Sequence, residues 1–349
     1  ARAGLQVVNL RDSIYLMGGR TPRPPSFPPI IGDSDIWGDV WWSGDRGVTW
    51  ECILETDDEN HWPARAYFEA VTKGGQMFVM GGQNFKVVEN PDCPPPYIDC
   101  LPYLPASDFF SDVWSSRDGV NWTQLTADAG WEPRAGLSAA VFKGDIYVLG
   151  GSQNDDESVG GPSGPERIYF NDVWKSSDGV NWVQLTDNAP WAPRAGARVV
   201  VKNGYLYLLG GEEGFFCLQP CDPPYFNDVW RTRNGVDWEL VTADAEWSPR
   251  PGHMAVVFRN HIVLWGGFGL STDLGDPFGS DNPMDVWVSR TGEHWVQVSD
   301  SPWDAVYPDQ IKYDFDALML QGGSHGRRQA IYTFGGDRED FDFTDPLNY

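Results

Sequence analysis

The chain contains little of several residue types and patterns, and each deficit excludes a class of protein. Only 25 Lys and Arg stand against 50 Asp and Glu, so the net charge of −25 disfavours nucleic acid and anionic membrane surfaces as partners. No apolar run reaches the roughly 18 residues that a membrane span needs, so we expect no membrane insertion. Helical periodicity is almost absent, whereas 39 Gly, 27 Pro and 18 Trp are typical of short strands separated by turns. The composition therefore predicts an all-β protein.

A sequence repeat runs through the whole chain. Five segments share Asp-Val-Trp, a Gly a few residues on, and a second Trp three residues after that Gly; the Asp-Val-Trp segments are 39–41, 112–114, 172–174, 228–230 and 285–287. A Gly pair that ends a short apolar run precedes each segment and occurs a sixth time; the pairs are 18–19, 81–82, 150–151, 210–211, 266–267 and 335–336. One such unit cannot bury its apolar face alone, so the units must pack on one another.

Each unit carries the signals of four short strands. In the third unit, apolar strands at 138–142 and 146–149 precede the Asp-Val-Trp strand and the strand of the second Trp. Four antiparallel strands form one blade of a β-propeller. We therefore predict a single six-bladed propeller over 1–349, with blades at about 1–62, 63–131, 132–191, 192–247, 248–303 and 304–349. Residues 345–349 align with 282–286, so the last blade is incomplete here, and we expect the natural polypeptide to extend beyond one or both ends.

These motifs resemble a known family. The Gly pair and the two tryptophans are similar to kelch repeats, as in the central domain of galactose oxidase. Residues 43–50, Ser-Gly-Asp-Arg-Gly-Val-Thr-Trp, resemble the Asp-box turn of sialidase-type propellers. The resemblance implies the propeller fold, but this scaffold carries enzymes, adaptors and lectin-like modules alike, so it does not assign a function.

The cysteines indicate an oxidising compartment. Cys93 with Cys100, and Cys217 with Cys221, each lie within one long loop, and we favour two local disulfides over a metal site. We therefore predict an extracellular or secreted protein. The fifth, Cys52, is interpreted as a small buried hydrophobic residue.

Two further sequence features allow competing interpretations. Asn121 begins a formal glycosylation sequon, Asn-Trp-Thr. The acidic segments 155–157 and 337–342 offer oxygen ligands to Ca²⁺, but we favour solvated loops and predict no metal or other cofactor.

We expect the functional face to be the one that carries the long loops 83–111, 152–171, 212–227 and 268–284. Aromatic side chains in these loops suit a sugar ring or a protein partner, although they could instead pack their own loops. The candidate binding aromatics are Tyr97, Tyr103, Phe109, Phe215, Phe216 and Tyr225.

An arginine recurs in the connections between blades, where it enters the innermost strand. The members of this series are Arg2, Arg65, Arg134, Arg194 and Arg250. Five guanidinium groups at the mouth of the channel could bind a carboxylate or sulfate. We favour the alternative that each pairs with the Asp of its own Asp-Val-Trp segment.

We predict a binding or assembly module rather than an enzyme. The five histidines occupy unrelated repeat positions, which argues against a copper site, and we find no unique polar residue that interrupts the repeat at the channel. The expected partner is a glycan or a protein, including further parts of the same polypeptide or assembly. The alternative is a sialidase-like enzyme acting on carbohydrate, for which Arg194, Arg250 and Tyr67 are conceivable site residues.

Overall fold

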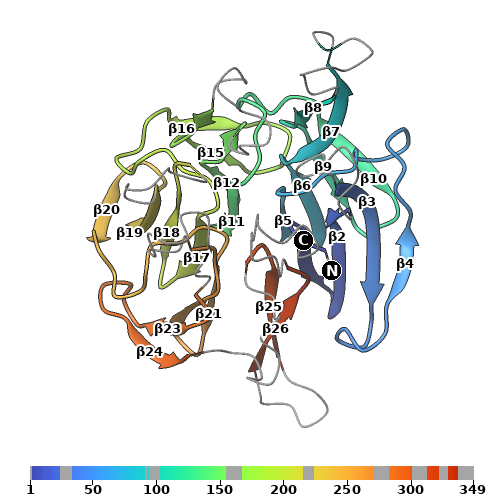
Figure 1. Ribbon diagram of the computed structural model, residues 1–349. Helices are drawn as coiled ribbons and strands as arrows, with labels where there is room; N and C mark the ends of the chain where they lie inside the picture. Colours follow the sequence, from blue (N-terminus) through green and yellow to red (C-terminus); the bar gives the residue numbers. More distant parts are fainter. Residues whose placement is uncertain are drawn as a thin grey trace.

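The computed structural model describes residues 2–23, 34–90, 93, 103–154, 167–214, 224–269, 283–300, 313–321 and 329–336. Within these ranges every element of regular secondary structure is a β-strand. A helix that could cross a membrane is accordingly not found among the described residues. Five four-stranded antiparallel sheets are arranged around a central axis as the blades of a β-propeller (Figure 1). The prediction of an all-β propeller is therefore confirmed.

Each blade begins with its innermost strand at the axis and proceeds outward in chain order. The strands of blade 1 are β1 (Gln6–Leu10), β2 (Ser13–Pro22), β3 (Ser34–Ser43) and β4 (Glu51–Leu54); of blade 2, β5 (Glu69–Lys73), β6 (Gln76–Met80), β9 (Val113–Ser116) and β10 (Trp122–Thr126); of blade 3, β11 (Ser138–Phe142), β12 (Asp145–Leu149), β15 (Val173–Ser176) and β16 (Val183–Thr186); of blade 4, β17 (Arg198–Lys202), β18 (Tyr205–Glu212), β19 (Tyr225–Thr232) and β20 (Trp238–Thr242); and of blade 5, β21 (Met254–Phe258), β22 (His261–Trp265), β23 (Val286–Ser289) and β24 (Val296–Ser299).

The predicted number of six blades is wrong: the structure shows five. The sixth repeat contributes only a two-stranded sheet in the described residues, made of β25 (Asp316–Gln321) and β26 (Gln329–Phe334). This repeat lacks an Asp-Val-Trp segment in the sequence, and therefore lacks the signals for the third and fourth strands. The alignment of residues 345–349 with a third strand lies outside the described residues. The exact blade boundaries stay a prediction.

The ring nevertheless closes through six repeats. One residue at the start of each innermost strand donates its backbone N–H to the carbonyl oxygen of its counterpart in the preceding repeat, with N···O distances of 2.9–3.3 Å. The six residues of this hydrogen-bond ring are Gly4, Tyr67, Gly136, Gly196, Gly252 and Asp314. The ring places the β25–β26 sheet between blade 5 and blade 1, in agreement with the contacts that β25 makes with β21 and β1.

The core lies between neighbouring blades. Trp62 is fully buried and meets Trp122 edge to face at 5.9 Å between ring centroids, and Trp131 meets Trp182 in the same way at 4.5 Å. In each pair, the first Trp lies in a connection between blades and the second is the second Trp of the repeat. Stacking of blades on one another therefore explains why both tryptophans recur.

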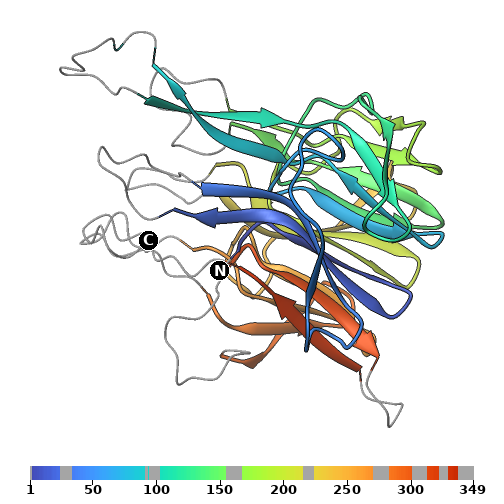
Figure 2. The same cartoon turned by 90° about the vertical axis from the view of Figure 1, so that its right-hand side faces the viewer.

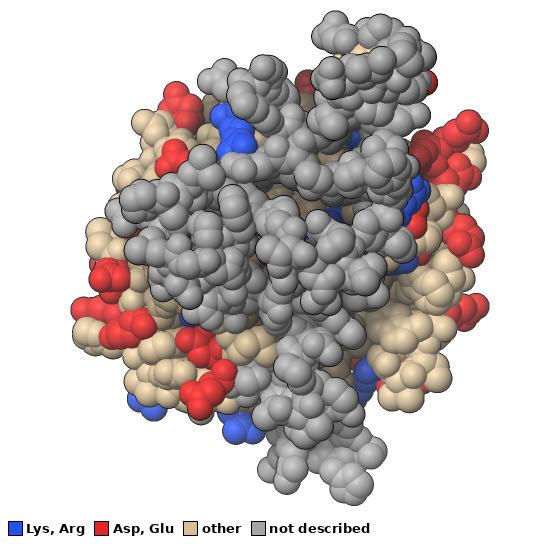
Figure 3. Space-filling view, viewed as in Figure 1, with Lys and Arg blue, Asp and Glu red and all other residues tan. Residues whose placement is uncertain are grey.

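The two faces of the disc differ. Seen from the side, the extended ends of β2 and β3 and the ribbon of β7 (Gln83–Glu89) and β8 (Tyr103–Phe109) project from the same face (Figure 2). A short pair, β13 (Ser152–Gln153) and β14 (Ile168–Tyr169), continues blade 3 in the same way. In the space-filling view, acidic side chains occupy more of the visible rim than basic ones do (Figure 3).

Candidate ligand-binding site at the mouth of the central channel

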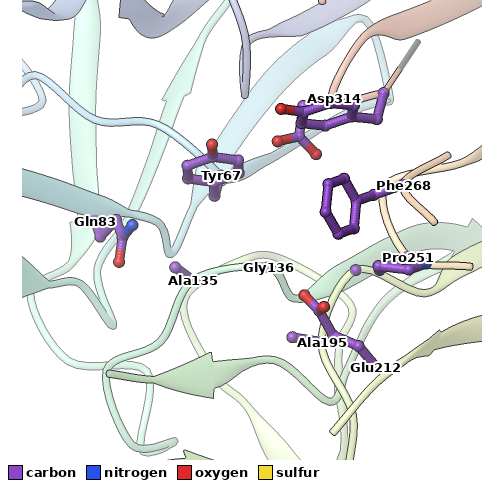
Figure 4. A pocket seen from close by; sticks show the side chains of 12 residues that line it. Tyr67, Gln83, Ala135, Gly136, Ala195, Glu212, Pro251, Phe268 and Asp314 are labelled. Carbon is purple, nitrogen blue, oxygen red and sulfur yellow. The ribbon is translucent and has the colours of Figure 1, made fainter. Parts of the chain in front are cut away.

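A cavity of about 130 Å³ lies on the propeller axis, where the innermost strands begin (Figure 4). For comparison, an apolar cavity of about 150 Å³ binds one benzene molecule, so this cavity is close in size to a site for a single small ring. Its lining comes from every repeat except the first: Tyr67, Gln83, Ala135, Gly136, Ala195, Gly196, Glu212, Pro251, Gly252, Phe268, Tyr313 and Asp314.

Five residues of the hydrogen-bond ring, all except Gly4, form the floor of the cavity, and all six residues of the ring have a positive φ between 53° and 62°. Glycine adopts this left-handed conformation without penalty and occupies four of the six positions. Tyr67 and Asp314 occupy the other two, although a side chain there costs about 1–2 kcal/mol. The repeat is therefore broken at two positions that face the cavity, contrary to our expectation that no unique residue interrupts it.

In blades 2, 4 and 5 the residue that follows the Gly pair contributes to the walls of the cavity, as Gln83, Glu212 and Phe268. This residue forms an isolated bridge with the residue after the repeated arginine, as in Ala66–Gln83 and Ala195–Glu212, and the bridge holds it beside the floor. In the five blades this position is held by five different residues: Arg20, Gln83, Ser152, Glu212 and Phe268. Equivalent backbone positions in blades 2, 4 and 5 therefore present three different side chains to the cavity.

Polar and aromatic groups converge on the cavity. Arg20 Nε donates a hydrogen bond of 2.7 Å to the phenol oxygen of Tyr67, which places a positive charge beside that oxygen. Phe268 is buried and contacts Tyr225 and Tyr313 edge to face, with ring centroids 6.1 and 5.4 Å apart. Figure 4 shows the side chains of Tyr67, Phe268 and Asp314 around the same space.

A second polar layer lies two residues further along the innermost strands, on the same side of each strand as the floor residues. Here side chains bond to the backbone of the next repeat: the Asp316 carboxylate accepts from the Val7 N–H at 2.6 Å, and Arg198 Nε donates to the His253 carbonyl at 3.0 Å. Arg198 also pairs with Glu69 at 3.4 Å. Burial raises the pKa of Glu69 to about 8, although Arg198 opposes this rise.

The five predicted channel arginines are engaged in ion pairs. Arg65 is fully buried and donates to both oxygens of Asp112 at 2.7 and 2.9 Å, and Trp114 Nε1 donates to the same carboxylate at 2.7 Å. The same bonds recur in Arg2–Asp39, Arg134–Asp172 and Arg194–Asp228. In blade 5, Arg250 pairs with Asp285 through one nitrogen only, and its other terminal nitrogen donates to the hydroxyl of Ser248. This is the structural alternative that we favoured, and it explains why Arg, Asp and Trp repeat together. A ligand-binding role for these arginines stays a prediction without support from the contacts.

Of the predicted loop aromatics, Tyr225 lies nearest the site, since its ring contacts Phe268 of the lining. Phe109 is half-buried near the end of β8, and for Tyr103 only its place in β8 is described. The remaining predicted aromatics, Tyr97, Phe215 and Phe216, lie outside the described residues.

The other predicted sites are only partly described. Cys93 is buried, while Cys100, Cys217 and Cys221 lie outside the described residues, so the two disulfides stay a prediction. Cys52 is a free, half-buried thiol, and burial raises its pKa.

The sequon and the acidic segments have the same status. Asn121 lies in the turn between β9 and β10, where its side-chain amide donates to Asp118 at 2.9 Å, and its glycosylation stays a prediction. The acidic segments 155–157 and 337–342 lie outside the described residues.

Sequence reasoning had considered Tyr67 but missed the rest of the polar lining. An alignment of the residues that follow the Gly pairs would have found Gln83, Glu212 and Phe268, because this position varies between blades whose motifs otherwise agree.

Comparisons with known proteins agree with this architecture. Over 91 residues the chain is 36% identical to the N-acetylneuraminate epimerases of Escherichia coli (strain K12) and Shigella flexneri. This segment is 26% of the chain and spans 22% of the length of those relatives. A solved structure titled "Structure of YjhT" superposes with a TM-score of 0.60 at 13% identity, covering 95% of this chain and 94% of that one, and so shows the same fold. A family model described as the KLHDC2/KLHL20/DRC7 Kelch-repeats domain matches residues 4–267, and the chain therefore belongs to the kelch-repeat family.

Proposed function

We propose that this protein binds a single sugar ring in the cavity at the mouth of its central channel. The observation that carries the proposal is that the repeat is broken where it faces this cavity: Tyr67 and Asp314 on the floor, and Gln83, Glu212 and Phe268 on the walls. Scaffold residues repeat in every blade, whereas residues that recognise a ligand need to differ from one direction to the next.

The chemistry of the lining suits a carbohydrate. The phenol of Tyr67, the amide of Gln83 and the carboxylates of Glu212 and Asp314 can exchange hydrogen bonds with sugar hydroxyls. Phe268 offers an apolar ring to the C–H face of a pyranose. The similarity to N-acetylneuraminate epimerases, which act on a carbohydrate, supports the same ligand class. We also propose that the protein is secreted and that its projecting loops bind a glycan or protein partner.

A catalytic role is the second candidate, and the contact between Arg20 and Tyr67 favours it. The hydrogen bond of 2.7 Å from Arg20 Nε fixes the phenol oxygen of Tyr67, and a phenol held beside a bound sugar can exchange a proton with it. Asp314 lines the same cavity and is separated from Tyr67 in the hydrogen-bond ring by one residue, Gly4. Interconversion of the anomers of a reducing sugar, followed by proton NMR with and without the protein, tests this role.

The test of binding is the variant Asp314→Gly. It restores the residue that four other repeats carry at this position and relieves the left-handed backbone, so the fold should keep its thermal stability or gain some. We expect sugar binding, measured by titration calorimetry against a panel of monosaccharides, to weaken at least tenfold. Phe109→Ala, on the projecting ribbon, serves as the matched control and should leave binding unchanged.

The two variants separate the channel from the outer loops. If both variants lost sugar binding equally, the cavity would not be the only binding site, and the projecting ribbon would be part of it. A wild-type protein that binds no monosaccharide and no terminal sugar on a glycan array would overturn the proposal and favour protein assembly.

A further inference from the structure

The repeat is also broken on the other face of the disc, in the turns that join the third and fourth strands of each blade. These turns lie at the opposite end of the strands from the projecting ribbons (Figure 2). In blades 1 to 3 the turn carries an aspartate that accepts hydrogen bonds from the turn backbone; the three are Asp45, Asp118 and Asp178.

Blades 4 and 5 replace this aspartate with uncharged residues, Asn234 and Thr291. The residue just before it is Arg233 in blade 4 and Arg290 in blade 5, where blade 3 has Ser177. The turns are otherwise equivalent, because in each the glycine N–H donates to the hydroxyl that begins the turn, at 2.8–2.9 Å. Two neighbouring turns therefore lack the negative charge of the repeat and present a positive charge.

Contacts connect these two turns through the hairpin of β17 and β18. Arg233 Nη2 donates to the Tyr205 hydroxyl at 2.8 Å, and its guanidinium lies over the Tyr205 ring at 4.4 Å from the centroid. Lys202 pairs with Tyr205 across the hairpin and donates its ammonium to the carbonyl oxygen of Arg290 at 2.7 Å. The cations of blade 4 and the turn of blade 5 thus form one continuous surface.

The contacts continue within blade 5. Arg290 Nε donates to Nε2 of His261 at 3.1 Å. Because arginine can only donate, the proton of this ring is on Nδ1, which donates to the carbonyl oxygen of Arg259 at 3.1 Å. The guanidinium of Arg259 lies over the ring of Phe258, 5.0 Å from its centroid. These turns together carry five cations, the basic strip: Lys202, Arg231, Arg233, Arg259 and Arg290.

Carboxylates balance only part of the basic strip. Arg231 donates to both oxygens of Glu239 at 2.8 Å. These bonds, with a smaller contribution from the charge of Arg233, lower the pKa of Glu239, so one carboxylate serves two guanidinium groups. Arg233, Arg259 and Arg290 are exposed, and none of the three forms an ion pair with a described Asp or Glu.

The local charge is opposite to that of the whole chain. Segments 202–205, 231–239, 259–261 and 289–294 hold five Lys and Arg against three Asp and Glu, whereas acidic residues outnumber basic ones two to one overall. Screening at physiological salt limits charge effects to about 8 Å, so a short ligand on the strip is attracted despite the net charge of −25.

The surroundings of the basic strip favour a peptide among acidic ligands. A guanidinium group binds a carboxylate through two parallel hydrogen bonds. Val236, in the same turn as Arg233, is 46% exposed, and the ring of Tyr205 is half-buried, so apolar side chains can also find contact here. A long polyanion would extend to the turns of the other blades, where Asp178 and Asp118 repel it.

We propose that the basic strip binds an acidic segment of a partner protein that also carries apolar side chains. Its carboxylates bond to Arg233, Arg259 and Arg290, and its apolar side chains cover Val236 and Tyr205. This surface lies on the face opposite the sugar cavity, so the proposal does not depend on the proposed function.

The experiment measures fluorescence anisotropy with three labelled ten-residue peptides in 150 mM salt. One contains Asp and Leu in equal number, the second has Asn in place of each Asp, and the third has Gly in place of each Leu. We expect the Asp–Leu peptide to bind at least tenfold more tightly than the Asn–Leu peptide and at least threefold more tightly than the Asp–Gly peptide. Raising the salt concentration should weaken its binding.

Matched variants assign the binding to the strip. Arg233→Ser and Arg290→Ser introduce the residue that blade 3 carries as Ser177, so both should keep the melting temperature of the wild type. Each should weaken binding of the Asp–Leu peptide at least threefold, and the double variant at least tenfold. Arg117→Ser makes the same change at the same position of blade 2, whose turn keeps Asp118, and should leave binding within twofold of wild type.

Three results would overturn the proposal. The first is that no acidic peptide binds to the wild-type protein. The second is an equal loss in Arg117→Ser and Arg233→Ser, because general charge and not the strip would then be the cause. The third is tighter binding of heparin than of the Asp–Leu peptide that is lost in the double variant, because the strip would then bind a polyanion and not a protein segment.

Discussion

Asp172→Asn removes the charge from the carboxylate that partners a fully buried arginine. Arg134 has no exposed surface, donates to both oxygens of Asp172, and also donates to the carbonyl oxygens of Gly150 and Glu132 at 3.0 and 2.8 Å. The ring of Phe170 covers the guanidinium at 3.8 Å. Arginine does not deprotonate in a protein, so in the variant its charge stays buried and unbalanced.

The expected loss is large because water cannot replace the carboxylate. Removing one partner of a buried ion pair costs about 3–5 kcal/mol, and whole domains are stable by about 5–15 kcal/mol. The asparagine retains one acceptor, and the two carbonyl oxygens remain, so we expect a loss of about 3 kcal/mol. Asp39→Asn is the matched control: the side chain of its partner Arg2 is 19% exposed, and solvation there should limit the loss to about 1 kcal/mol.

Urea unfolding at pH 7, followed by tryptophan fluorescence, measures both variants against wild type. At an unchanged slope, a lower midpoint reports lost stability. A loss below about 1 kcal/mol for Asp172→Asn, or an equal loss in both variants, would refute the reasoning that burial of the pair stabilises the blade.

Three further predictions concern the channel, the turns and the free thiol. Since the pKa of Glu69 is about 8 in the fold against 4.5 as its ordinary value, the folded protein holds an extra proton between these pH values. The stability that this proton provides is fully present below pH 4.5 and is lost as the pH rises through 8. Glu69→Gln should therefore flatten the fall in melting temperature between pH 5 and 8.5, and an equal slope in wild type and variant would contradict this. Gly150→Ala should destabilise the fold by at least about 1 kcal/mol more than Gly74→Ala does. Both glycines have φ near 60°, but only at Gly150 would the new Cβ clash with a backbone oxygen, that of Arg194 at 2.7 Å. Equal melting temperatures of the two variants would contradict this prediction. Cys52 should react with iodoacetamide at pH 7.5 more slowly in the folded protein than in urea, since burial raises its pKa, and equal rates would show an open thiol.

The repeat made the blades predictable because the bonds that stabilise a blade are local to it. In blade 2, Arg65, Asp112 and Trp114 form one hydrogen-bonded group, so the recurrence of the three types in the sequence signals one recurring contact. The number of blades was not predictable in the same way. A Gly pair marks the end of a second strand, and the sixth pair says nothing about whether a third and fourth strand follow.

The cavity was harder to predict because its residues are adjacent only in the closed ring. Tyr67 and Asp314 are separated by most of the chain, yet both extend the same hydrogen-bond ring on either side of Gly4. The positive φ of these residues cannot be read from their identity, since it is imposed by the glycines that surround them in the ring. A position that is glycine in most repeats is therefore most informative where it is not glycine.

Tyr67 carries this argument further than Asp314. Aspartate visits the left-handed region at modest cost, whereas a bulky aromatic residue there is uncommon and needs surrounding structure to hold it. The ring supplies that structure through hydrogen bonds of 2.9 Å to Gly4 and Gly136 on either side, and Arg20 fixes the phenol end. Packing alone does not require the tyrosine, because four other repeats close the ring with glycine at this place. The backbone strain at Tyr67 therefore agrees with the proposed sugar site, in which a hydrogen bond from the ligand to this hydroxyl would offset the cost of the strain.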